Sequence, residues 1–163
     1  PVEGFIGTIN QKKGFEDNWI DCFLNLRIIP QLSILKSTTL DTEIIKKVKE
    51  KIKSELLNHK PINALVHGDL WSGNAGSTKS GKGVIFDPAS WWADNEVDIA
   101  MTKLFGGFKK EFYEEYHRFF PIKNGFEKRI IIYNFYHILN HANMFGGGYL
   151  IQVKDYVKAI LNM

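Results

Sequence analysis

From residue 96 to residue 161 the chain repeats apolar residues at α-helical spacing, and this pattern limits the fold more than any other feature. The repeats are interrupted at Gly106-Gly107, at Pro121 and at Gly146-Gly147-Gly148, which are residues that end helices. The spacing predicts helices near 96–104, 109–119, 125–143 and 148–161. The second half of the chain is therefore mainly helical.

The first half has two further helical patterns. One covers Asp17–Ile29 and is expected to end before Pro30, because proline disfavours helix in the residue before it. The second begins at Thr39 or Asp41, either of which can cap it. Its apolar face consists of Ile44, Ile45, Val48, Ile52, Leu56 and Leu57.

Between these helical regions lie two short apolar runs that are typical of strands. They are Ala64–Val66 and Gly83–Phe86, and the segment 76–82 between them is rich in Gly, Ser and Lys. We predict an α+β fold, mainly α, in which residues 1–163 form a single domain around a small central β-hairpin.

Composition and charge exclude few classes of protein. The 21 basic and 18 acidic residues leave a net charge of +3, which gives no support to a nucleic-acid partner. No apolar run is long enough for a membrane-spanning helix. The only cysteine, Cys22, has no visible role and cannot form an intrachain disulfide, which fits the reducing cytoplasm.

The stretch HGDLWSGN, residues 67–74, carries the strongest chemical signal. An aspartate in a loop, Asp69, can accept the proton of an attacking hydroxyl. Asn74 follows five residues later and Asp87 follows the next predicted strand, so both can offer hard oxygen ligands to Mg²⁺. This layout is typical of kinase phosphoryl transfer. The simpler interpretation of Asp69 and Asn74 is a pair of turn residues that bond their own backbone.

Other chemistries fit less well. His137 and His141 have the i, i+4 spacing of a metal-binding helix but lack the accompanying glutamate, and no G-x-S-x-G motif is present.

HGDLWSGN, followed by VIFDPASWW, DIA and LFGGF, resembles the fructosamine (ketosamine) kinase family, which shares the protein-kinase-like fold. FIGTINQKKGFEDNWIDCFLNLRIIPQL upstream and GFEKRIIIYNFYHILNHANMFGGGY downstream extend the resemblance over nearly the whole chain. It implies the C-terminal, substrate-binding lobe of a kinase that uses ATP and Mg²⁺ to phosphorylate a sugar hydroxyl of a ketosamine, free or protein-bound.

The resemblance also implies roles for individual residues. Asp69 would be the catalytic base, and Asn74 and Asp87 the Mg²⁺ ligands. Trp71 would stack on the sugar or amine part of the substrate, although core packing is the alternative. His141 and Asn143, from the motif LNHxNxFG, would face the substrate or else bond locally within their helix. The loop would be supported by His67, Gly68 and Asp98.

A kinase of this fold also needs an N-terminal ATP-binding lobe with a glycine-rich loop and a strand lysine. No such pattern precedes residue 60, so we expect residues 1–163 alone to bind ATP poorly. Two alternatives remain open: a small-molecule kinase of the aminoglycoside or choline type, and a truncated, non-catalytic lobe. The preferred ketosamine and the oligomeric state do not follow from the sequence.

Overall fold

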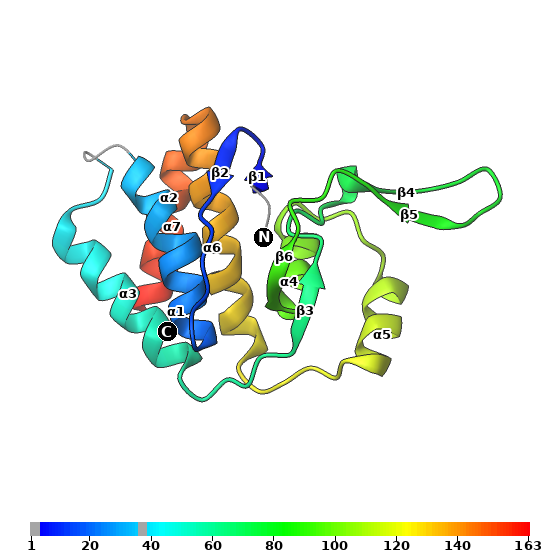
Figure 1. Cartoon of the computed structure of the whole chain (residues 1–163), viewed down its shortest axis with the longest axis horizontal. Helices are drawn as coiled ribbons and strands as arrows, with labels where there is room; N and C mark the ends of the chain where they lie inside the picture. Colours follow the sequence, from blue (N-terminus) through cyan, green and yellow to red (C-terminus); the bar gives the residue numbers. More distant parts are fainter. Residues whose placement is uncertain (1–3, 36–38) are drawn as a thin grey trace.

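The computed structural model describes residues 4–35 and 39–163 and is mainly helical, with three small antiparallel ribbons (Figure 1). Its helices are α1 (Trp19–Phe23), the π-helix η1 (Leu24–Ile28), α2 (Ile29–Ile34), α3 (Thr42–Leu56), the 3₁₀ turn η2 (Ser72–Asn74), α4 (Glu96–Leu104), α5 (Lys110–Phe119), α6 (Phe126–Phe145) and α7 (Gly148–Leu161). Its strands are β1 (Gly4–Ile6), β2 (Ile9–Gln11), β3 (Asn63–Val66), β4 (Ala75–Ser77), β5 (Gly83–Ile85) and β6 (Trp91–Asp94).

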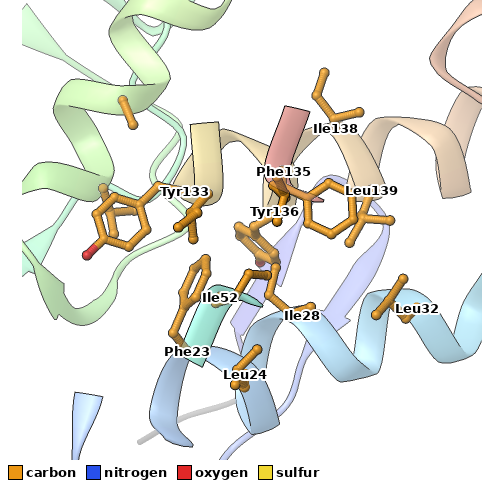
Figure 2. Close-up of a cluster of buried hydrophobic side chains, with 14 of the residues drawn as sticks. Phe23, Leu24, Ile28, Leu32, Ile52, Tyr133, Phe135, Tyr136, Ile138 and Leu139 are labelled. Atoms are coloured by element: carbon orange, nitrogen blue, oxygen red, sulfur yellow. The ribbon is translucent and has the colours of Figure 1, made fainter. Parts of the chain in front are cut away.

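Helix α6 lies at the centre of the molecule. It contacts α7, α4, α2 and α3, so the helices of the N-terminal third and those of the C-terminal third share one core (Figure 1). Helix α6 contributes the most fully buried side chains, and α4, α3 and the continuous helix α1–η1–α2 contribute others. Figure 2 shows this cluster, which includes Phe23, Leu24, Ile28, Leu32, Ile52, Tyr133, Phe135, Tyr136, Ile138 and Leu139.

The first helix does not end before Pro30, as the sequence predicted, but continues to Ile34. A π-turn removes the conflict. The N–H of Ile29 bonds to the carbonyl of Leu24, five residues back, and Pro30 then falls in the first turn of α2. Proline is tolerated there because the N–H groups of a first turn have no partner within their own helix.

The other predicted helices match closely. Apart from α5, in which no residue is buried, they pack an apolar face against the core. Asp41, rather than Thr39, caps α3: its side chain accepts a hydrogen bond from the N–H of Ile44. Helix α6 extends two residues beyond its predicted end and stops at Gly146, which has φ of 62°. Among the described residues no helix combines the length and apolarity needed to cross a membrane.

The strands pair differently from the single hairpin that the sequence suggested. The predicted strand at 64–66 is part of β3, but β3 pairs with β6, which was not foreseen. The predicted strand at 83–86 is β5 and pairs with β4. The loop at residues 67–74 therefore leaves one ribbon and enters another. A further hairpin, β1–β2, was also missed.

A buried polar network joins the β3–β6 ribbon to the helical core. Asp94, at the end of β6, is completely buried. Its Oδ2 accepts a hydrogen bond from the Tyr133 hydroxyl at 2.7 Å and lies 2.6 Å from Nε2 of His59, while Oδ1 accepts from the N–H of Ile62. The Tyr133 hydroxyl in turn accepts a hydrogen bond from the indole N–H of Trp19. Burial alone would raise the pKa of Asp94, but its bonds to His59 and Tyr133 outweigh burial and lower it.

We expect Asp94→Ala to lower the free energy of unfolding at pH 7 by about 3–5 kcal/mol, because it leaves buried donors without their acceptor. The lowered pKa sets the sign of the pH dependence: the ionised carboxylate stabilises the fold above its unfolded pKa of about 4, and this stabilisation is lost as the pH falls further. Urea unfolding of the wild type and of Asp94→Ala from pH 7 to pH 3 measures the difference in their free energies of unfolding. This difference should become smaller only below about pH 4.

Asp41→Ala is the matched control, since it removes an exposed cap of α3 and should cost about 1 kcal/mol. Equal losses for the two variants would contradict the structural importance of the Asp94 network.

Candidate functional site

The segment 67–74, called here the HGD loop, connects β3 to β4 and is hydrogen-bonded to α4. Asp98, in the first turn of α4, accepts hydrogen bonds from the backbone N–H of His67 at 2.7 Å and of Gly68 at 2.8 Å. Burial raises the pKa of Asp98 more than these two bonds lower it. The side chain thus fixes the first two residues of the loop.

The histidine of the loop fixes the segment that carries Asp87. The Nε2 atom of His67 lies 2.8 Å from the carbonyl oxygen of Phe86, and His67 is buried. The N–H of Phe86 also bonds to the carbonyl of Asn74. Asp87 comes next, exposed and with φ of 56°, a left-handed conformation that is uncommon for a residue with a Cβ. Two bonds therefore hold the Asp87 segment against the loop.

Asp69 and Asn74 face each other across the loop. The Nδ2 atom of Asn74 donates to the backbone carbonyl of Asp69 at 2.9 Å and lies 3.3 Å from its Oδ2. The other amide atom of Asn74, Oδ1, accepts no hydrogen bond from the described part of the chain. An amide oxygen and the exposed carboxylate of Asp87 are donors that suit a hard cation.

The pKa of Asp69 is raised above that of an ordinary aspartate. Burial is the largest cause, and the negative charge of Asp87 acts in the same direction. His141, His67 and the bond from Asn74 act in the opposite direction. These influences place Asp87 and His141 in the electrostatic surroundings of Asp69. A carboxylate with few donors and a raised pKa is suited to accept a proton.

Aromatic rings extend from the HGD loop to α6. Trp71 is 39% exposed and stands edge-on to Phe105, whose ring contacts that of His141 at a centroid distance of 5.1 Å. His141 also contacts Phe145 and Tyr149. The Nδ1 atom of His141 lies 2.8 Å from the carbonyl oxygen of His137, so in the neutral ring Nδ1 carries the proton and Nε2 is an acceptor.

Asn143 lies apart from this group. Its Nδ2 donates to the backbone carbonyl of Gln31 at 2.9 Å and to Oε1 of the same residue at 2.7 Å. Two positions beyond His141, it points to another side of α6 and binds that helix to α2. In the structure its side-chain amide thus joins two helices, and a substrate contact of Asn143 stays a prediction.

Phe105 was not recognised as a site residue from the sequence. It follows α4, and the chain then passes the HGD loop so closely that a Cβ on Gly107 would come within 2.5 Å of the Ser72 side chain. The available signal was the motif LFGGF, in which Gly107, at φ of 105°, permits this approach.

Gly68 and Gly81 provide a test of how tightly the HGD loop is packed. Their φ angles are similar, 83° and 80°, but a Cβ on Gly68 would lie 2.2 Å from the carbonyl oxygen of Ala89, whereas nothing lies within 4 Å of one on Gly81. We expect Gly81→Ala to lower the free energy of unfolding by about 1 kcal/mol, and Gly68→Ala by roughly 2–4 kcal/mol. Chemical denaturation measures the loss in free energy of unfolding for each variant. Equal losses would show that the Ala89 segment moves away from the new Cβ without an energetic cost.

Comparison with known proteins identifies relatives over the full chain. The family model described as fructosamine kinase matches residues 1–163. A protein of Synechocystis sp. named "probable ketoamine kinase" is 44% identical over 99% of this chain and 55% of its own length. The ketosamine-3-kinase of Mus musculus is 38% identical over 88% of this chain and 47% of its own length.

Solved structures agree with these relatives. A structure from Haemophilus somnus assigned as a fructosamine-3-kinase matches with a TM-score of 0.87 and 28% identity, over 98% of this chain and 55% of the other. One from Thermobifida fusca matches with a TM-score of 0.86 and 27% identity, over 99% of this chain and 57% of the other. The chain thus spans about half the length of the relatives it matches. With the family model covering every residue, the chain belongs to the fructosamine kinase family.

Proposed function

We propose that this chain contains the acceptor and metal side of a kinase that transfers the γ-phosphoryl group of ATP to a hydroxyl of a ketosamine sugar. The observation that carries the proposal is the grouping of Asp69 and Asn74, on the HGD loop, with Asp87, whose segment is bonded to that loop, in a member of the fructosamine kinase family. The named ketoamine and ketosamine kinases among the relatives support the choice of acceptor.

In this proposal Asp69 orients the acceptor hydroxyl and receives its proton. The hydroxyl oxygen forms a bond to the γ-phosphorus, the bond from that phosphorus to the bridging oxygen breaks, and ADP leaves. Oδ1 of Asn74 and the carboxylate of Asp87 would hold Mg²⁺, which neutralises charge on the phosphate oxygens when bound. Asn74 thereby serves two groups, because its Nδ2 keeps Asp69 in place.

The aromatic rings of Trp71 and Phe105 supply a surface for the rest of the acceptor. The substituted amine of a ketosamine carries a positive charge at neutral pH, and a cation packs favourably against aromatic faces. Nε2 of His141 can accept a hydrogen bond from the same amine or from a sugar hydroxyl.

The nucleotide must also be covered on its other side, by an N-terminal kinase lobe that we propose as the partner of residues 1–163. The single thiol, Cys22, suits the reducing cytoplasm that we propose for the protein.

We expect Asp69→Asn to lower kcat for ketosamine phosphorylation by a factor of about 10²–10⁴, because the amide cannot receive the proton. Asp155→Asn, at an exposed position on α7, removes the same charge and should leave kcat unchanged. Steady-state assays of the intact protein and both variants, with thermal unfolding as a check on folding, measure the effect. Near wild-type turnover of Asp69→Asn would show that the base is assigned wrongly.

The choice of acceptor is tested separately. We expect the intact protein to phosphorylate a ketosamine such as fructosyl-lysine with kcat/KM at least 10²-fold higher than for an aminoglycoside or for choline, since a site built to hydrogen-bond and stack on one acceptor rejects others by such factors. Coupled measurement of ADP release gives the three values. A preference for choline or an aminoglycoside would favour another small-molecule kinase, and no transfer to any acceptor would favour a non-catalytic lobe.

A further inference from the structure

A cavity of about 610 Å³ lies between the segment 12–18 and the β3–β6 ribbon. Its size is within the range of small-molecule sites. None of the residues proposed for phosphoryl transfer lines it, neither Asp69, Asn74 and Asp87 nor Trp71 and His141. The cavity is therefore separate from the HGD loop, and what it binds does not depend on the proposed function.

One wall of this cavity is formed by a buried cation, Arg27, which is 6% exposed. Its Nη1 donates to the backbone carbonyls of Lys12 at 3.2 Å and Leu26 at 2.8 Å. Its Nε is buried and has no hydrogen-bond partner, and Nη2 donates to no group within residues 4–35 and 39–163. Two of its three nitrogens thus donate to no group in the described part of the chain.

No carboxylate of the described residues forms an ion pair with Arg27. The guanidinium stacks on the ring of Trp91, with 3.9 Å between its central carbon and the ring centroid, and this contact compensates only part of its lost hydration. Burial accordingly lowers the pKa of Arg27. Arginine is almost never buried without an anionic partner, so among the residues that the structure describes this positive charge of the cavity wall is unmatched.

The other residues of the lining indicate what kind of molecule would carry an anionic group that pairs with Arg27. Three of the four tryptophans of the chain, Trp19, Trp91 and Trp92, line the cavity. Trp19 and Trp91 stack on each other and Trp92 is exposed, so together they give the cavity an aromatic wall. Glu16 and Asp17 also line it and are exposed. Lys12 and Lys13 line the cavity as well and are exposed, so the charges at its rim balance. Arg27 is then the one buried charge in the described lining, which favours a ligand with a single anionic group.

We propose that this cavity is a binding site for a small organic anion, in which Arg27 pairs with one carboxylate or phosphate group and the tryptophans hold an apolar ring. Arginine suits both groups because its planar fork matches their paired oxygens.

The test uses benzoate and phenyl phosphate as probes, with benzamide as their neutral counterpart, titrated into the intact protein. Tryptophan fluorescence reports binding, and the shift in thermal unfolding midpoint provides a second readout. We expect Arg27→Gln to weaken binding of the preferred anion ten-fold or more and to leave benzamide unchanged. The two anions show whether the site prefers a carboxylate or a phosphate.

Arg118→Gln is the matched control, since it removes one positive charge from an exposed position of α5 and should not change binding. If Arg27→Gln does not fold, Trp92→Ala provides the test, because Trp92 is 69% exposed. Its loss should weaken binding of the anionic probe at least three-fold, since the contact with the ring of the probe is lost. The proposal is overturned if neither anion binds the wild-type protein saturably at millimolar concentration, or if Arg27→Gln binds as tightly as Arg118→Gln.

Discussion

The two hydrogen bonds from the backbone of His67 and Gly68 to Asp98 connect the proposed active site to the rest of the structure. Asp98 stands in the first turn of α4, where the helix dipole favours a negative charge. Helix α4 is itself fixed to α6 by the bidentate pair of Glu96 with Arg129. The position of the HGD loop is thus determined by the packing of two helices that lie far beyond it in the sequence.

From this anchor the positions of the reactive groups follow in sequence. His67, with its backbone held by Asp98, uses its ring to hold the carbonyl of Phe86 and so places the segment of Asp87. Asn74 closes the loop onto Asp69 at its other end. Asp69, Asn74 and Asp87 are brought together in this way although the two carboxylates repel each other and share no direct bond.

The sequence predicted most of the helices well because they bury an apolar face, and burial has the period of the helix. Helix α5, in which no residue is buried, was bounded instead by Gly106-Gly107 and Pro121. It failed at Pro30, since the π-turn that accommodates the proline is not visible in any periodicity. It also failed in the pairing of strands, because runs of three or four residues such as β3 and β5 contain no signal for their partner. Spacing alone was enough to propose Asp69, Asn74 and Asp87 as site residues. Phe105 lies beside the proposed site only because of the path of the chain after α4.

Three half-buried or buried aspartates differ in how far hydrogen bonds compensate the loss of water around the carboxylate. Burial acts to raise the pKa of all three. Asp94 receives donors from His59, Tyr133 and Ile62, so its net shift is downward and its charge stabilises the fold. Asp98 has two backbone donors, which do not fully compensate burial. Within the described part of the chain, the Asp69 carboxylate has one hydrogen-bond donor, the side chain of Asn74 at 3.3 Å. The aspartate with the fewest donors keeps its lone pairs available, which is the condition that a base must meet.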